Sequence, residues 1–253
     1  MLHIFRRHPF PVKAEFRHSL VLTYAFPTKL LAPLLPPGLV LDAYECHGFV
    51  AIALVATSRL RPSFLPKALG LDFFLSGYRI FTRLGSSSSA LRGLYILRSD
   101  TDKPLMYRAG NMFTHYKYSL CRAVCENDGA ELRIAITTAD GQADLSVRAQ
   151  LNSRPAPLPE KSPFASLDAA RRFAGPLPYT FDYEPQTNSV IAVRGVRERW
   201  EPQPVQVTFE QAPTFFSRPP FNEVQPVLAN AFYLEGVPYR WECGRRIRID
   251  NDR

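Results

Sequence analysis

The chain has 253 residues, of which 46% are hydrophobic and 21% are charged, so it can bury a sizeable core and is not disordered as a whole. Its 31 basic and 23 acidic residues give a net charge of +8, which attracts anions such as small carboxylates, nucleic acid or acidic lipid. No helix-turn-helix, zinc-finger or RNA-reading motif accompanies this charge, so we do not expect nucleic-acid binding.

Cysteine usage and the N-terminus indicate a cytoplasmic protein. The four cysteines are too few and too badly spaced for a disulfide framework or a zinc site, and Cys121 and Cys125 are expected to be buried free thiols. The longest apolar run, from Phe49 to Ala56, is far shorter than a membrane span. The sequence also lacks GxGxxG, phosphate-loop, GxSxG and HExxH motifs, so we expect neither cofactor nor metal.

The first hundred residues predict many short elements, because 23 prolines and 13 glycines punctuate the chain. A strand is expected at Ser19–Phe26, and a short helix is expected to begin at Pro27 and to stop at Pro36-Pro37-Gly38. Further expected strands are Leu39–Cys46 and Phe49–Leu60, a hairpin around His47-Gly48, and Phe73–Leu84 and Leu91–Arg98, which flank the loop GSSSSA at residues 85–90.

The apolar and aromatic stretch PLMYRAGNMFTHYKYSLCRAVCE, residues 104–126, is strand-like and contains one lysine, Lys117. A period of two places His115 and Lys117 on one face and Tyr116 on the other. If Lys117 points inward, burial lowers its pKa, and Arg108 could lower the pKa further as a second cation, which leaves a neutral amine able to attack a carbonyl group. Alternatively, Lys117 extends to the surface from a half-buried strand.

The second half of the chain returns repeatedly to strands. Turns at Asn127-Asp128-Gly129 and Asp140-Gly141 lead into expected strands at Glu131–Thr138 and Ala143–Leu151. Residues 152–163 carry four prolines and are the best candidate for an internal boundary. A helix is expected over residues 165–174, with Ser162-Pro163 as its cap and opening. The last expected strands are Asn188–Trp200, Val205–Gln211 and Pro238–Ile249.

This order of elements predicts a mainly β (α+β) fold in one domain, residues 1–253. Successive strands joined by tight turns favour an antiparallel meander that closes into a barrel or cone, with a few peripheral helices. We find no internal repeat of fixed period.

Two parts of the sequence resemble a known superfamily. SLVLTYAFPTKLLAPLLPPGLVL is similar to the strand, helix and Leu-Pro turn that open acetoacetate-decarboxylase-like proteins, and Arg108 through HYKYS falls where that superfamily has a lysine-bearing strand. The segment AARRFAGPLPYTFDYEPQTNSVIAVRGVRERWEPQPVQV is similar to an uncharacterised bacterial family placed beside the decarboxylases. The resemblance implies a double-layered antiparallel β-cone around an apolar cavity, with a Schiff-base lysine at Lys117.

That resemblance implies specific chemistry. A protonated imine on Lys117 would be an electron sink for the carbanion left when carbon dioxide departs from a β-keto acid. Arg108 or Arg79 could hold the carboxylate, and His115 or Tyr116 could move protons. The aromatic residues that could line the cavity with Arg79, or could be plain core, are Tyr78, Tyr95, Tyr107 and Tyr116.

The sequence departs from the decarboxylase pattern at three places. Tyr24 is followed by Ala25 where decarboxylases carry arginine, residues 71–83 contain no glutamate, and Lys117 has tyrosine neighbours where decarboxylases have a lysine pair. Two functions therefore stay open: a lyase-like or other Schiff-base enzyme for a small keto acid or carbonyl compound, and a non-catalytic small-molecule-binding β-barrel. Either would take an anionic or carbonyl-bearing ligand, and a homo-oligomer is compatible with both.

Overall fold

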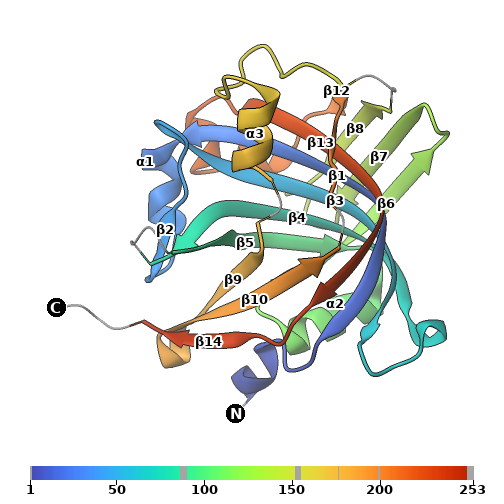
Figure 1. Cartoon of the computed structure of the whole chain (residues 1–253), viewed down its shortest axis with the longest axis vertical. Coiled ribbons are helices and arrows are strands. Elements are labelled where there is room, and N and C mark those ends of the chain that lie inside the picture. Colours follow the sequence, from blue (N-terminus) through green and yellow to red (C-terminus); the bar gives the residue numbers. More distant parts are fainter. Residues whose placement is uncertain (1, 86–89, 152–154, 176, 199, 250–253) are drawn as a thin grey trace.

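The computed structural model describes residues 2–85, 90–151, 155–175, 177–198 and 200–249 (Figure 1). A strongly curved sheet of 14 strands dominates this part of the chain, and short helices lie outside it (Figure 1). The mainly β prediction is confirmed. The expectation of a purely antiparallel sheet is wrong, because β5 runs parallel to both β6 and β9.

The elements are as follows. The strands are β1 (Val12–Pro27), β2 (Leu39–Leu41), β3 (His47–Pro62), β4 (Leu71–Leu84), β5 (Leu91–Thr101), β6 (Tyr118–Asn127), β7 (Glu131–Thr138), β8 (Leu145–Gln150), β9 (Tyr179–Glu184), β10 (Ser189–Arg197), β11 (Gln203–Pro204), β12 (Gln206–Gln211), β13 (Val227–Trp241) and β14 (Arg245–Arg248). The α-helices are α1 (Thr28–Leu31), α2 (Pro104–Phe113) and α3 (Leu167–Phe173). The 3₁₀ helices are η1 (Leu2–Arg6), η2 (Ala32–Leu34), η3 (Lys67–Leu69), η4 (Pro185–Thr187), η5 (Thr214–Ser217) and η6 (Phe221–Glu223).

Seven strands form a closed ring, which we call the strand ring. β5 pairs with β4 on one side and with β9 on the other, and the path runs on through β10, β13, β1 and β3 back to β4. Alternation along each strand separates two faces. On β3, for example, Ala51, Ala53 and Val55 line a cavity, whereas Ile52 and Leu54 lie in the main hydrophobic core.

A second layer made of β6, β7, β8 and β12 covers the strand ring on the opposite face from the cavity. Leu132 and Ile134 of β7 lie in one cluster with Ile52, Leu54 and Ile80 of the ring, and all five are essentially inaccessible. Each such side chain contributes about 1.5–3 kcal/mol when it leaves water. This core leaves the inner face of the ring available for a site.

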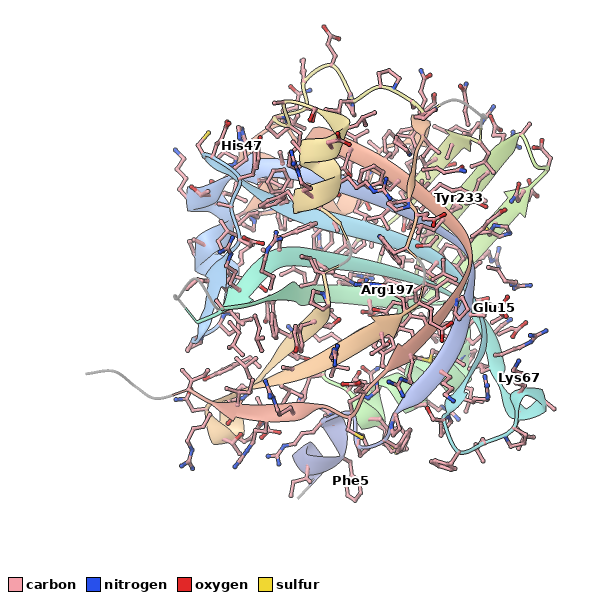
Figure 2. All side chains as sticks on the ribbon, viewed as in Figure 1. Phe5, Glu15, His47, Lys67, Arg197 and Tyr233 are labelled. Atoms are coloured by element: carbon pink, nitrogen blue, oxygen red, sulfur yellow. The ribbon has the colours of Figure 1, made fainter. Side chains whose placement is uncertain are left out.

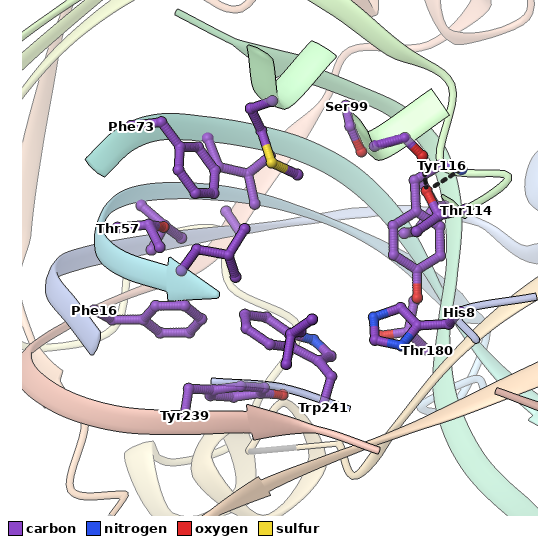
Figure 3. Close-up of a pocket in the computed structure, with 18 of the residues that line it drawn as sticks. His8, Phe16, Thr57, Phe73, Ser99, Thr114, Tyr116, Thr180, Tyr239 and Trp241 are labelled. Carbon is purple, nitrogen blue, oxygen red and sulfur yellow. Dashed lines mark hydrogen bonds between the residues drawn. The ribbon is translucent and has the colours of Figure 1, made fainter. Parts of the chain in front are cut away.

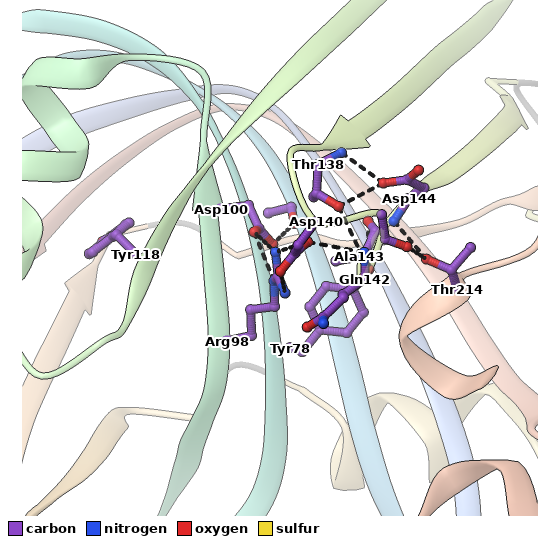
Figure 4. Close-up of polar contacts among 12 residues, drawn as sticks. Tyr78, Arg98, Asp100, Tyr118, Thr138, Asp140, Gln142, Ala143, Asp144 and Thr214 are labelled. Atoms are coloured by element: carbon purple, nitrogen blue, oxygen red, sulfur yellow. Dashed lines mark hydrogen bonds and ion pairs between the residues drawn. The ribbon is translucent and has the colours of Figure 1, made fainter. Parts of the chain in front are cut away.

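A partly buried ion cluster fixes the second layer to the ring (Figure 4). Arg98 of β5 donates to Asp100 at 2.8 Å and to both carboxylate oxygens of Asp140, in the β7–β8 turn, at 2.8 and 2.9 Å. Tyr78 of β4 donates to the carbonyl oxygen of Ala143 at 3.3 Å in the same turn. Asp100 is fully buried, so Arg98 supplies the charge that makes this burial tolerable.

The strand expected over residues 104–126 is wrong in its first half. Pro104 occupies the first turn of α2, where a missing N–H costs nothing, and Met106 and Gly110, four residues apart, form the buried side of the helix. A side chain at Gly110 would collide with the ring of Tyr118. Lys117 has a left-handed φ of +53°, and β6 begins only after it.

The hairpin expected from Leu39–Cys46 and Phe49–Leu60 is also wrong. β2 is only three residues long and pairs with β4, while β3 pairs with β1 and β4. Asp42 explains why β2 pairs with β4 and not with β3. Its fully buried carboxylate lies 2.6 Å from both Arg83 of β4 and Arg92 of β5. β9 and the first half of β13 are strands that the sequence pattern did not predict.

Other expectations are confirmed. β4 and β5 form the predicted hairpin. The helix expected over residues 165–174 forms as α3, but its cap is Ser166 and not the expected Ser162-Pro163: the Ser166 side chain accepts a hydrogen bond from the Ala169 N–H at 3.1 Å. Within the loop at 85–90, residues 86–89 lie outside the described residues, as do residues 152–154 of the candidate boundary. In the described part of the chain, no helix is both long and apolar enough to cross a bilayer.

Candidate functional site

A cavity of about 400 Å³ lies inside the strand ring (Figure 3). One end is aromatic, where Tyr239 stacks on Phe16 with ring centroids 4.7 Å apart and contacts Trp241 at 4.4 Å. The other end is polar, and there the hydroxyl of Tyr116 points toward His8 and Thr180 (Figure 3). A volume of this size suits a small organic molecule with a polar group at one end.

Arg79, in the middle of β4, is the main charged group in this cavity. Its side chain lines the cavity, its Nε is inaccessible without a hydrogen-bond partner, and no carboxylate contacts it within the described residues. Burial lowers the pKa of Arg79, and the nearby phenols of Tyr239, Tyr118 and Tyr116 act in the opposite direction. Arginine stays protonated in proteins, so the cavity holds a fixed positive charge.

Gly77 makes room for that charge. A Cβ at Gly77 would lie 3.0 Å from Nη2 and 3.1 Å from Nε of Arg79, closer than ordinary van der Waals contact. The two residues are two positions apart on one strand and therefore share its cavity face. The guanidinium thus lies across a position without a side chain.

The charge of the cavity wall is one-sided. Its described lining residues include Arg61, Arg79 and Arg197 but no aspartate or glutamate. His8 adds little charge, because burial lowers its pKa to about 4 and leaves the imidazole neutral at pH 7. The potential inside the cavity is therefore positive.

Arg197, at the end of β10, is the second cation of the wall. It donates to the carbonyl oxygen of Leu177 at 2.9 Å and to the hydroxyl of Tyr239 at 3.3 Å, and its Cζ lies 4.5 Å from the centroid of the Trp200 ring. Burial lowers its pKa. These contacts hold the guanidinium in place but do not neutralise it.

A basic groove of about 550 Å³ adjoins the cavity, and Arg61, Arg197 and Tyr239 line both. The groove is lined by six basic and two acidic residues: Lys13, Arg59, Arg61, Lys67, Arg197, Arg240, Glu15 and Glu198. The positive electrostatic potential of such a groove attracts anions toward the cavity.

Two acidic groups lie near the polar end. The hydroxyl of Tyr116 is inaccessible and has no hydrogen-bond partner in the described structure, and burial raises its pKa well above 10. Asp182 of β9 is also buried, its Oδ1 accepts a hydrogen bond from the Tyr183 N–H at 2.8 Å, and its Oδ2 has no described partner. Burial raises the pKa of Asp182 to about 7, against the smaller effect of the Lys117 charge. A carboxyl group with this pKa can exchange protons near neutral pH.

Lys117, Arg108 and His115 are not among the residues that line the cavity. Lys117 is exposed, and its Nζ lies 6.0 Å from the centroid of the Tyr95 ring. Arg108 is exposed on α2. His115 points to Glu184, with its Nε2 3.9 Å from a carboxylate that Arg7 also holds at 2.6 Å.

Of the candidate tyrosines, only Tyr116 lines the cavity. Tyr78 is fully buried on the opposite face of β4, stacked on Phe215 with ring centroids 4.1 Å apart. Tyr95 lies in a separate apolar cluster with Phe181 and Val190, and Tyr107 is exposed on α2. The structure thus brings together Arg79 and Tyr116 from the predicted set.

Sequence reasoning missed much of the wall. His8, Thr180, Arg197, Tyr239 and Trp241 all line the cavity. The segment PYRW carried a usable signal, because Tyr239 and Trp241 are two residues apart and so share a strand face. All four cysteines are free; Cys46 and Cys243 are exposed, and Cys121 and Cys125 are half-buried. Within the described chain, no cluster of three or more His, Cys, Asp or Glu side chains could hold a metal ion.

Solved structures share this fold at low sequence identity. Acetoacetate decarboxylase from Legionella pneumophila is 12% identical with a TM-score of 0.62, over 94% of this chain and 88% of that one. An acetoacetate-decarboxylase-like enzyme from Sphingomonas wittichii is 13% identical with a TM-score of 0.60, over 95% and 93%. The enduracididine biosynthesis enzyme MppR complexed with pyruvate is 12% identical with a TM-score of 0.60, over 95% and 91%.

The fold is therefore acetoacetate-decarboxylase-like, as the sequence resemblance implied. No curated protein matches the chain in sequence. A family model described as an uncharacterized conserved protein, DUF2071, matches residues 13–238, which is most of the chain. The chain belongs to the DUF2071 family.

Proposed function

We propose that this protein binds a small carboxylate with an apolar body inside the strand ring. The observation that carries the proposal is Arg79, a partly buried cation that lines an apolar cavity and has no carboxylate partner among the described residues. An uncompensated charge of this kind is costly in a folded protein unless a ligand pairs with it.

The carboxylate would lie on the Arg79 guanidinium, which binds two carboxylate oxygens at once through parallel N–H donors. The hydroxyl of Tyr116 is a further donor without a described partner at the polar end. The aromatic surface of Phe16, Tyr239 and Trp241 suits an apolar or aromatic body. One protein of this fold is complexed with pyruvate, itself a small keto acid, which supports the ligand class by analogy.

A Schiff-base reaction at Lys117 is the alternative function. It requires a desolvated amine beside the ligand. Lys117 is exposed and stands outside the lining residues, so our proposal assigns no chemical step to it.

Binding is tested with three matched compounds: 3-phenylpropanoate, the keto acid phenylpyruvate and the uncharged 3-phenylpropanamide. We expect both acids to raise the thermal unfolding temperature and the amide to have a much smaller effect, because only a carboxylate pairs with Arg79. Calorimetry then gives the dissociation constants. Equal stabilisation by acid and amide, or none by either acid, would refute the assignment to Arg79.

A further inference from the structure

Three segments meet at one end of the molecule and form what we call the basal face: residues 4–10, residues 62–70 between β3 and β4, and residues 103–113 with α2. Backbone hydrogen bonds join them, from the His8 N–H to the Phe113 carbonyl at 2.9 Å and from the Ser63 N–H to the Pro11 carbonyl at 2.8 Å. Phe10 contacts both Phe64 and Phe113, with ring centroids 6.3 and 5.0 Å apart. Figure 1 shows the N-terminus, α2 and the β3–β4 connection at the same end of the fold.

Large apolar side chains on the basal face are exposed. Phe64 is 74% exposed, Leu69 66% and Leu105 63%, the highest values among the large apolar residues of the described chain. Ile4, Phe5 and Met112 add to this group. A concentration of exposed apolar residues on one face marks an interaction surface.

The basal face is also basic. Its three segments, IFRRHPF, PSFLPKALG and KPLMYRAGNMF, contain no aspartate or glutamate. Arg6, Lys67 and Arg108 are exposed there, and Figure 2 shows Phe5 and Lys67 at the outer edge of the molecule. Lys103 is exposed as well, although its Nζ lies 3.5 Å from Asp102, which flanks the face.

On α2 the two properties combine on one stripe. Leu105, Arg108 and Met112 are spaced at i, i+3 and i+7 and are all exposed, whereas Met106 and Gly110 are buried on the other side. The exposed stripe of α2 therefore offers apolar side chains and a positive charge to the same binding partner.

The cavity reaches this face. Leu69 and Leu105, two of its most exposed residues, also line the cavity, together with Pro62, Phe10 and Phe113. A ligand that leaves or enters past these residues passes directly across the basal face.

From this arrangement we infer that the basal face docks on an anionic lipid bilayer and places the cavity mouth at the membrane surface. Apolar side chains would enter the headgroup region while Lys67 and Arg108 face anionic headgroups. A second copy of the chain is a poorer occupant, because a symmetric contact would bring two basic faces without acidic residues together. The inference does not depend on the identity of the cavity ligand.

Co-sedimentation with phosphatidylcholine vesicles, with and without phosphatidylglycerol, tests the docking. We expect the protein to sediment with the anionic vesicles only and to be released by salt. Phe64→Ser with Leu69→Ser should lower the apparent affinity at least about tenfold, from lost apolar burial. Lys67→Gln with Arg108→Gln should lower it about 25-fold, at about fivefold for each lost charge.

A matched control is Leu120→Ser with Val124→Ser on β6, which removes apolar residues that are 37% and 45% exposed on a different element. This pair should leave vesicle binding unchanged. The docking inference is overturned if the unaltered protein ignores anionic vesicles, if the β6 pair weakens binding as much as the basal pair, or if the basal substitutions change only self-association in sedimentation velocity. Since no carboxylate is present, such a failure leaves the ligand proposal standing.

Discussion

Replacing Arg79 by methionine should stabilise the folded protein while it weakens carboxylate binding. Methionine keeps a flexible apolar stem of similar length and removes the charge. The reason for the opposite effects is that Arg79 lacks a carboxylate partner in the described structure and lines an apolar wall. If Arg79 is kept for ligand binding, it lowers the stability of the ligand-free protein.

The magnitude follows from the cost of burying an unpaired ion. The penalty is several kcal/mol for a fully buried ion, but Arg79 keeps access to the cavity, so we expect a gain of about 1–3 kcal/mol in the free energy of unfolding. For a chain of this size, that corresponds to a rise in Tm of roughly 3–10 °C. Charged hydrogen bonds contribute about 1.5–3 kcal/mol, so the affinity for 3-phenylpropanoate should fall about 10- to 100-fold.

Urea unfolding and calorimetry measure the two quantities, and Arg98→Met is the matched control. Arg98 is a buried arginine of the neighbouring strand that does have partners, Asp100 and Asp140. Its loss leaves the Asp100 charge buried and should cost about 3–5 kcal/mol. A destabilised Arg79→Met protein, or one that binds the acid as tightly as before, would show that Arg79 serves packing and not ligand binding.

Three further predictions follow from the same contacts. Gly77→Ala should push the Arg79 guanidinium aside by a few tenths of an ångström, and calorimetry should show a carboxylate affinity about tenfold lower while Tm changes little. Unchanged affinity would argue against the placement of the guanidinium. Burial raises the pKa of Asp182 to about 7, so the folded chain holds a proton that the unfolded chain releases above about pH 4. The free energy of unfolding should therefore fall by roughly 2–4 kcal/mol as the pH rises from about 4 to about 7. Asp182→Asn should remove this pH dependence in urea titrations. Borohydride with phenylpyruvate should leave Lys117 unmodified in peptide mass mapping, because the amine is exposed and not at the cavity, and an adduct that is lost in Lys117→Ala would restore the Schiff-base function.

Local patterns predicted the elements whose signals are local. The Asn127-Asp128-Gly129 turn forms as expected, with the Asp128 carboxylate accepting hydrogen bonds from the N–H groups of Ala130 and Glu131 at 2.9 and 2.7 Å. The helix α3 forms within the expected range, although Ser166 caps it and not Ser162. The sequence also allowed Arg79 of β4 to be predicted as a site residue, because a charged residue in a mainly apolar strand often marks a functional site.

Long-range pairing could not be predicted in this way. The parallel contact of β5 with β9 joins residues far apart in sequence, such as Gly93 and Tyr179, and no local pattern encodes it. The parallel contact with β6 requires the crossover helix α2, which the sequence pattern did not predict. The strand prediction for residues 104–117 was wrong for a different reason. The aromatic and apolar residues of this stretch fit both periods, and the deciding signals were Pro104 at the start and the four-residue spacing of Met106 and Gly110.

The arginines of this chain show why the cavity charge points to a ligand. Arg7, Arg83, Arg92 and Arg98 each contact a fully buried carboxylate at 2.8 Å or less. Three of the four buried acids in the described chain, Asp42, Asp100 and Glu184, are therefore paired with arginine, and Asp182 is the exception.

Around the cavity this pairing stops. Arg197 contacts Tyr239, Trp200 and the Leu177 carbonyl oxygen, neither Arg79 nor Arg197 contacts a carboxylate in the described structure, and no acidic residue lines the wall beside them. Asp182, a buried acid near Tyr116 whose pKa burial raises to about 7, is half protonated near neutral pH and so is a poor permanent counter-ion. The missing negative charge is thus confined to the inner face of the strand ring, where a carboxylate from solution can supply it.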